Sequence, residues 1–90
     1  VLKFEAEWCA PCKAMTEQTL SQPDVKAMLA ERFVFKSIDV DYEPSTAWTL
    51  GVGPIPDLRV FDADGNELAR NVGAVGPDAL MELLTRLAAS

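Results

Sequence analysis

The chain has 90 residues, of which 49% are hydrophobic, and its 8 basic and 14 acidic residues give a net charge of −6. This length suffices for one domain with one core, which residues 1–90 are expected to form, and the ordinary composition excludes a solenoid or a disordered tail. The negative charge argues against nucleic acid and anionic lipid as partners. No apolar run approaches the roughly 20 residues that span a bilayer, so no membrane insertion of this segment is expected.

The first strand is predicted at residues 1–6, VLKFEA, because side chains alternate in character and place Lys3 and Glu5 on one face. The chain begins with Val1 inside this strand, so we expect further sequence upstream of it. A helix is predicted from about Pro11, in the sequence PCKAMTEQT, since proline is well tolerated in a first helical turn.

A second helix is predicted from the sequence SQPD, with Ser21 as its cap, and it should end near Arg32. Residues 33–41, FVFKSIDVD, are rich in β-branched and aromatic side chains, which is typical of a strand. A strand, a helical crossover and a second strand predict a βαβ unit with parallel strands.

The second half of the chain begins with a predicted short helix at residues 43–51, followed by two prolines in VGPIP that interrupt regular structure. Residues 57–72 predict a hairpin turned around Asp64 and Gly65. A last helix from Pro77 carries a leucine stripe on one side, formed by Leu80, Leu83, Leu84 and Leu87. Together the elements predict an α/β fold.

Cys9 and Cys12 stand three positions apart in the sequence WCAPC. A structural zinc site takes four Cys or His ligands, and with two cysteines and no histidine this chain would need a second chain to bind zinc. A permanent disulfide that closes so short a loop would constrain the unfolded chain little. A strand that runs into Cys-x-x-Cys at a helix start favours a reversible thiol–disulfide pair, which needs neither a metal nor a bound cofactor.

The two sulfurs are predicted to have different roles. Cys9 lies just before the predicted helix, where unpaired N–H groups and the helix dipole favour an anion, so we expect it to be the exposed nucleophilic thiolate. Cys12 lies one turn further along, so it should be more buried and should act as the resolving thiol that releases the partner.

The segment AEWCAPCK resembles the thioredoxin active site, with Ala10 where most thioredoxins have glycine. The segment GVGPIPDLRVFDADGNELARNVGA resembles the second half of that family, which implies that the Ile55–Pro56 bond is cis and faces the cysteines, and that Gly73 ends the hairpin. The implied fold is thioredoxin-like, with a mixed sheet of at least four strands flanked by helices, but without the first strand and helix of a full thioredoxin. Residues 19–35 are more similar to the carboxy-terminal periplasmic domain of transmembrane thiol:disulfide interchange proteins, which slightly favours a periplasmic or exported location over a cytoplasmic one.

The resemblance implies an enzyme, a protein-disulfide oxidoreductase that acts as a monomer and receives electrons from an upstream reductant. Pro11 between the cysteines resembles the reducing members of the family, so reduction of protein disulfides is the expected direction. The substrate-binding residues implied are Trp8, Ala10, Pro11, Ile55 and Pro56. The alternative is a non-catalytic module that uses the same scaffold to bind a partner protein.

Some positions depart from the family pattern. Lys3 stands where thioredoxins usually have a buried aspartate, and we interpret Glu5, held by Lys3, as the replacement proton acceptor for Cys12; the alternative is a solvated ion pair at a strand end. Asp57 replaces a common threonine and is expected to alter partner choice, while Trp48 is expected to pack its helix. The acidic run DVDYE is interpreted as a solvated face rather than a calcium loop, because the glycine and terminal glutamate of such a loop are missing.

Overall fold

The computed structural model describes residues 1–89 and contains a mixed sheet of four strands in the order β2-β1-β3-β4. Strand β1 (Leu2–Glu5) pairs parallel with β2 (Lys36–Asp39) and antiparallel with β3 (Asp57–Phe61). Strand β4 (Glu67–Val72) pairs antiparallel with β3 to complete the sheet. The α/β class, the βαβ unit and the mixed sheet are therefore confirmed.

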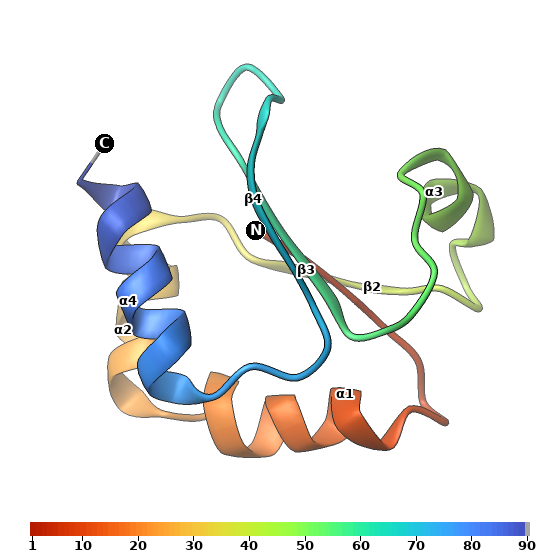
Figure 1. The fold of residues 1–90 in the computed structure, drawn as a ribbon, viewed down its shortest axis with the longest axis horizontal. Helices are drawn as coiled ribbons and strands as arrows, with labels where there is room; N and C mark the ends of the chain where they lie inside the picture. Colours follow the sequence, from red (N-terminus) through yellow and green to blue (C-terminus); the bar gives the residue numbers. More distant parts are fainter. Residues whose placement is uncertain (90) are drawn as a thin grey trace.

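Helices cover both faces of this sheet (Figure 1). Helix α1 (Ala10–Met15) continues into a π-helical turn, η1 (Thr16–Leu20), and the chain then enters α2 (Pro23–Arg32). These elements and α4 (Pro77–Ala88) lie on one face, whereas the short α3 (Pro44–Thr49) lies on the other. The first predicted helix thus has the expected position, but its second half is π-helical rather than α-helical.

The core is divided by the sheet, because successive side chains of a strand point to opposite faces. On the face of α1, α2 and α4 the buried apolar residues are Met15, Val25, Leu29, Leu58, Leu80 and Leu84. On the face of α3 they are Phe4, Ile38 and Ala47. The predicted leucine stripe of the last helix is confirmed: Leu80 and Leu84 are at most 1% exposed, and Leu83 and Leu87 are half-buried.

The segment between α2 and β2 differs from its prediction as a long strand. Val34 is 84% exposed, while Phe33 and Phe35 pack against the helical core, so the ladder begins only at Lys36. The predicted serine cap is also wrong: Gln22 is the cap residue of α2, and the Ser21 hydroxyl donates to the Glu17 carbonyl instead.

The hairpin between β3 and β4 forms where it is predicted. Gly65 has a φ of +85°, a conformation that glycine adopts without steric cost. The Asp62 carboxylate accepts hydrogen bonds from the backbone amides of Asp64 and Asn66, and these bonds lower the pKa of Asp62, with Asn66 making the largest contribution. Across residues 1–89, no helix combines the length and apolar character that a membrane crossing requires.

Candidate active site

Cys9 and Cys12 form a disulfide at the start of α1, with their Cα atoms 5.3 Å apart. Cys9 is the N-cap of this helix, as predicted, and its sulfur accepts the backbone N–H of Cys12 at 3.2 Å. The expectation that Cys9 is exposed is wrong for this oxidised form, since the two cysteines are 3% and 2% exposed. Cys9 is covered because it packs in a small cluster with Ala6 and Ile55.

A second backbone segment faces the disulfide. The Ile55–Pro56 peptide bond is cis, as predicted, and the Ile55 carbonyl oxygen lies 3.7 Å from the Cys9 sulfur. The Pro56 carbonyl is occupied, because it accepts the backbone N–H of Gly73 at 2.8 Å. Gly73, which ends the hairpin with a φ of +98°, therefore holds this loop against the sheet.

The Lys3 ammonium lies beneath α1 and is fully buried. It donates to the Glu5 carboxylate at 2.9 Å, to the Cys12 carbonyl at 3.1 Å and to the Thr16 hydroxyl at 2.7 Å. These three bonds use all three donors of an ammonium group, which offsets the cost of burying it. The alternative of a solvated ion pair is therefore wrong for Lys3, because its ammonium group is buried.

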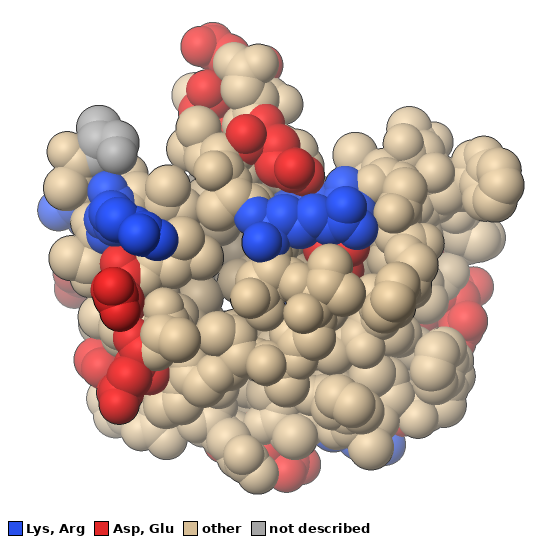
Figure 2. All heavy atoms as spheres, viewed as in Figure 1, with Lys and Arg blue, Asp and Glu red and all other residues tan. Residues whose placement is uncertain are grey.

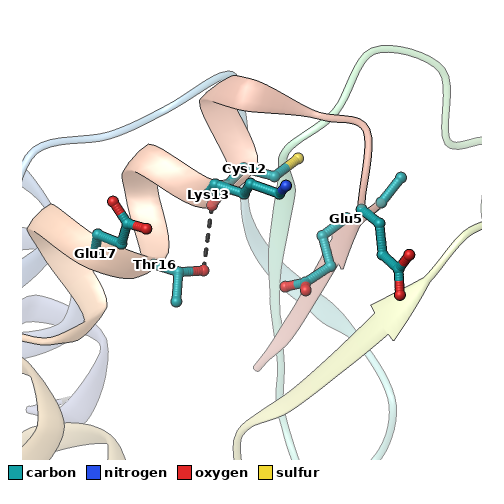
Figure 3. A pocket seen from close by; sticks show the side chains of 7 residues that line it. Glu5, Cys12, Lys13, Thr16 and Glu17 are labelled. Carbon is teal, nitrogen blue, oxygen red and sulfur yellow. Dashed lines mark hydrogen bonds between the residues drawn. The ribbon is translucent and has the colours of Figure 1, made fainter.

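Glu5 belongs to both this ion pair and the surface, since its side chain is 31% exposed. It lines a pocket of about 220 Å³ together with Cys12, Lys13 and Thr16, in which Glu5 comes from the strand side and the others come from the helix (Figure 3). Within residues 1–89 the Glu5 carboxylate makes no hydrogen bond to the Cys12 sulfur, so its role as proton acceptor stays a prediction.

Two polar residues of the site were missed by sequence reasoning. Thr16 bridges Lys3 and the Cys12 carbonyl, and its place one helical turn after Cys12 was the available signal. Asp41 accepts the indole N–H of Trp8 at 2.8 Å across a sequence separation of 33 residues, and no local pattern marked that pairing.

The surface beside the disulfide contains residues predicted to contact substrates. Trp8 is 70% exposed, and Ala10 and Pro11 are exposed as well. Ile55 is half-buried and Pro56 is fully buried, so that segment can offer its backbone more readily than its side chains. Trp48, expected to pack its helix, is instead 87% exposed, because Ala47 is the residue of α3 that faces the sheet.

Asp57, directly after the cis proline, is fully buried, so it can act on partner choice only indirectly, and that expectation stays a prediction. Its carboxylate accepts hydrogen bonds from Arg59 and Arg70, which stand directly opposite each other on β3 and β4. Burial alone would raise the pKa of Asp57, but the hydrogen bonds and charges of the two arginines hold it below its usual value. The missed signal was the predicted hairpin itself, which places these arginines opposite each other.

The family model of the thioredoxin-like domain matches residues 1–88. This chain belongs to the thioredoxin-like family. Among its relatives, the thioredoxin of Chlamydia muridarum is 36% identical over 88 residues, which covers 96% of this chain and 79% of the relative. The thioredoxin of Bacillus subtilis is 36% identical over 83 residues, which covers 92% of this chain and 76% of the relative.

Solved structures of other thioredoxin-like proteins superpose closely. A thioredoxin from Thermus thermophilus matches with a TM-score of 0.80 and 28% identity, covering 96% of this chain and 70% of that one. The oxidised DsbD C-terminal domain of Neisseria meningitidis matches with a TM-score of 0.80 and 29% identity, covering 94% of this chain and 76% of that one. With its Cys9–Cys12 disulfide at the helix start, this thioredoxin-like chain is a thiol–disulfide oxidoreductase.

Proposed function

We propose that this protein reduces disulfide bonds in partner proteins, with Cys9 as the nucleophile and Cys12 as the resolving thiol. The observation that carries the proposal is the position of the Cys9 sulfur, which caps α1 and lies 3.7 Å from the Ile55 carbonyl. A Cys9 thiolate at this position accepts the Cys12 N–H, and this hydrogen bond stabilises the charged form that attacks.

The reaction begins with the reduced pair. The Cys9 thiolate attacks one sulfur of the partner disulfide, forms a mixed disulfide and expels the second partner sulfur as a thiolate. The Cys12 thiol then loses its proton and attacks the Cys9 sulfur, which restores the Cys9–Cys12 disulfide and releases the first partner sulfur. Two electrons pass to the partner, and an upstream dithiol reductant must return them by the reverse exchange.

The partner's extended chain is held by the Ile55 backbone beside Pro56, with Trp8, Ala10 and Pro11 forming the rest of the contact surface. This assignment is supported by the exposure of Trp8 and of the two residues between the cysteines. The Trp8 indole is fixed by its bond to Asp41, so it offers a rigid apolar surface beside the reacting sulfurs.

The proton of Cys12 is accepted by Glu5, directly or through water in the pocket that both residues line. That pocket, at about 220 Å³, is far larger than the roughly 10–15 Å³ that one water needs. Lys3 fixes the Glu5 carboxylate at 2.9 Å and also binds the Cys12 carbonyl at 3.1 Å, so it holds the acid and the resolving cysteine in one network.

Insulin reduction in the presence of a dithiol reductant tests the proposed activity. The wild-type protein should accelerate reduction, Cys9→Ser should abolish the effect, and Cys12→Ser should accumulate a mixed disulfide with the substrate. A wild-type protein that binds a partner but does not accelerate reduction would contradict the proposal and favour the non-catalytic binding module.

We also propose that the domain acts as a monomer. We further propose a periplasmic or exported location, because residues 19–35 are similar to the periplasmic domains named above. Sedimentation of the purified chain should give the mass of a single copy. Fractionation of cells that produce the natural protein should place it outside the cytoplasm; recovery in the cytoplasmic fraction would contradict the location.

A further inference from the structure

Arg70 connects the two ends of the loop that faces the disulfide. Its guanidinium donates to the Gly51 carbonyl at 3.4 Å and to the Asp57 carboxylate at 2.9 Å, so one side chain binds the first and last residues of the segment 51–57. Ile55, whose carbonyl lies beside the Cys9 sulfur, is in the same segment. The shape of this loop near Cys9 therefore depends on a residue from β4.

Asp57 is a fixed anchor for this connection. Its carboxylate is fully buried and accepts hydrogen bonds from both Arg59 and Arg70. Arg59 is itself buried: its guanidinium lies 5.6 Å from the centre of the Phe4 ring and 3.6 Å from the Glu67 carboxylate. Because these groups come from three strands of the sheet, the Asp57 end of the loop cannot move without disturbing the sheet.

Arg70 is the member of this ion cluster that lies nearest to solvent. Its side chain is 39% exposed, and Figure 2 shows basic side chains grouped between the hairpin and the region of α3. An exposed cation could instead contact an acidic partner directly. The hydrogen bonds favour an internal role, since both Nε and Nη2 are directed to groups of this chain.

We propose that Arg70 is a positioning residue for protein substrates, which holds the loop 51–57 so that the Ile55 backbone is presented beside Cys9 before a partner arrives. This inference rests on the proposed function, in which a partner's extended chain pairs with Ile55. A loop that is already ordered spares the complex the entropy cost of ordering it on binding. A small disulfide that reacts at the sulfur without pairing to the loop does not depend on this ordering.

The test compares a protein substrate with a small one. Arg70→Met should raise KM for insulin about tenfold, as expected when ordering of a loop must be repeated at each binding event, while kcat stays within about twofold. The rate with a small aromatic disulfide reagent should also stay within about twofold. Lys26→Met, which removes an exposed cation from the distant helix α2, serves as the matched control and should leave both substrates unaffected.

Arg70→Lys separates loop positioning from charge. Lysine keeps the cation but lacks the planar fork that binds two groups at once, so its KM for insulin should rise like that of Arg70→Met. A wild-type KM for Arg70→Lys would overturn the proposal in favour of a direct charge contact with the substrate. An unchanged KM for Arg70→Met, or an equal loss of rate with the small disulfide, would overturn it as well.

Hydrogen exchange gives an independent measurement of the loop. The amides of Val52, Gly53 and Ile55 should exchange faster in both Arg70 variants than in the wild type, whereas those of β1 should be unchanged. Unchanged exchange in the loop contradicts the proposal even if a variant loses activity. Failure of the wild-type protein to reduce insulin contradicts the proposed function instead, so the two failures are distinguishable.

Discussion

Lys3 and Glu5 form a polar network between β1 and α1, on a face of the sheet where the other buried side chains are mostly apolar. The Lys3 ammonium donates to the Cys12 carbonyl in α1 and to the Thr16 hydroxyl at the start of η1, so it binds both helical segments to β1. The pair also connects β1 with the helix that carries the resolving sulfur. Its functional and structural contributions are separable, because kinetics report on Glu5 and unfolding reports on Lys3.

Glu5→Gln should slow resolution of a trapped mixed disulfide by about 10²-fold, within the usual range for general-base catalysis. Attack by Cys9 should change little, since the variant keeps the shape of the side chain. Glu7→Gln is the matched control, because Glu7 lines the same pocket and has no ion pair with Lys3. Stopped-flow measurement of both steps checks this, and equal resolution rates in the two variants would show that the proton leaves through water alone.

Lys3→Met should lower the free energy of unfolding by about 2–3 kcal/mol, the range for a hydrogen bond to a charged group whose loss leaves partners unpaired. Adding Glu5→Leu should recover part of this loss, because it removes the half-buried carboxylate that Lys3→Met leaves without its partner. Urea unfolding of the two variants and of the wild type measures the difference. No recovery in the double variant would indicate that Thr16 and the Cys12 carbonyl, rather than the ion pair, account for the cost.

At the scale of elements, the hairpin was predictable because its turn chemistry is local. Asp64 and Gly65 mark the turn, and Arg59 lies opposite Arg70 beyond a register shift between Val60 and Phe61. Strand β1 and the disulfide position were equally readable, since alternation and the Cys-x-x-Cys spacing are short-range patterns. The limits of β2 could not be predicted from the sequence, because Phe33 and Phe35 have high strand propensity but pack on the helical core.

The site's long-range contacts could not be predicted in the same way. Trp8 meets Asp41 and Cys9 meets Ile55 only because β1, β2 and β3 lie side by side in the sheet. The burial of Asp57 could be predicted only by combining the register of the hairpin with the placement of Arg59 and Arg70 on the same face of the sheet as Asp57. Local patterns therefore predicted the reacting sulfurs, whereas the groups that position them required the tertiary structure.

Gly65→Ala should destabilise the protein by about 1–2 kcal/mol, the cost of placing an L-residue in the left-handed region at a φ of +85°. No neighbouring atom would contact the added methyl group, so the change isolates the backbone conformation. Gly53→Ala is the control, because Gly53 has equal space and no positive φ. Thermal unfolding checks the pair, and equal effects would mean that the turn has rearranged.

At the scale of the molecule, charges are buried on both faces of the sheet near the disulfide, and apolar side chains fill the remainder. The Lys3 pair lies on the face of α1, and the cluster of Asp57, Arg59 and Arg70 lies on the face of α3. The active-site end of the sheet thus depends on protonation in a way that the leucine-rich core does not.

Asp57 should make the protein less stable in acid. Because its pKa is lowered in the folded state, its contribution is complete above the unfolded value of about 3.8 and is lost as the pH falls through the folded value. Asp57→Asn should be less stable than the wild type at pH 7, and the difference should shrink below about pH 4. Unfolding measured in an Asp62→Asn background removes the other aspartate whose pKa is lowered, and a pH-independent difference would contradict the assignment.

The burial of these charges also determines how the protein should respond to ionic strength. Mobile ions screen exposed charges but reach buried ones poorly, so added salt should weaken the Lys3 and Asp57 networks, each of which has a buried central charge, less than it weakens exposed pairs. The net charge of −6 is carried largely by exposed groups, and it acts on an approaching partner. A salt titration should therefore change KM for a charged protein substrate while the rate of resolution by Cys12 stays constant, which makes ionic strength a measure of the encounter alone.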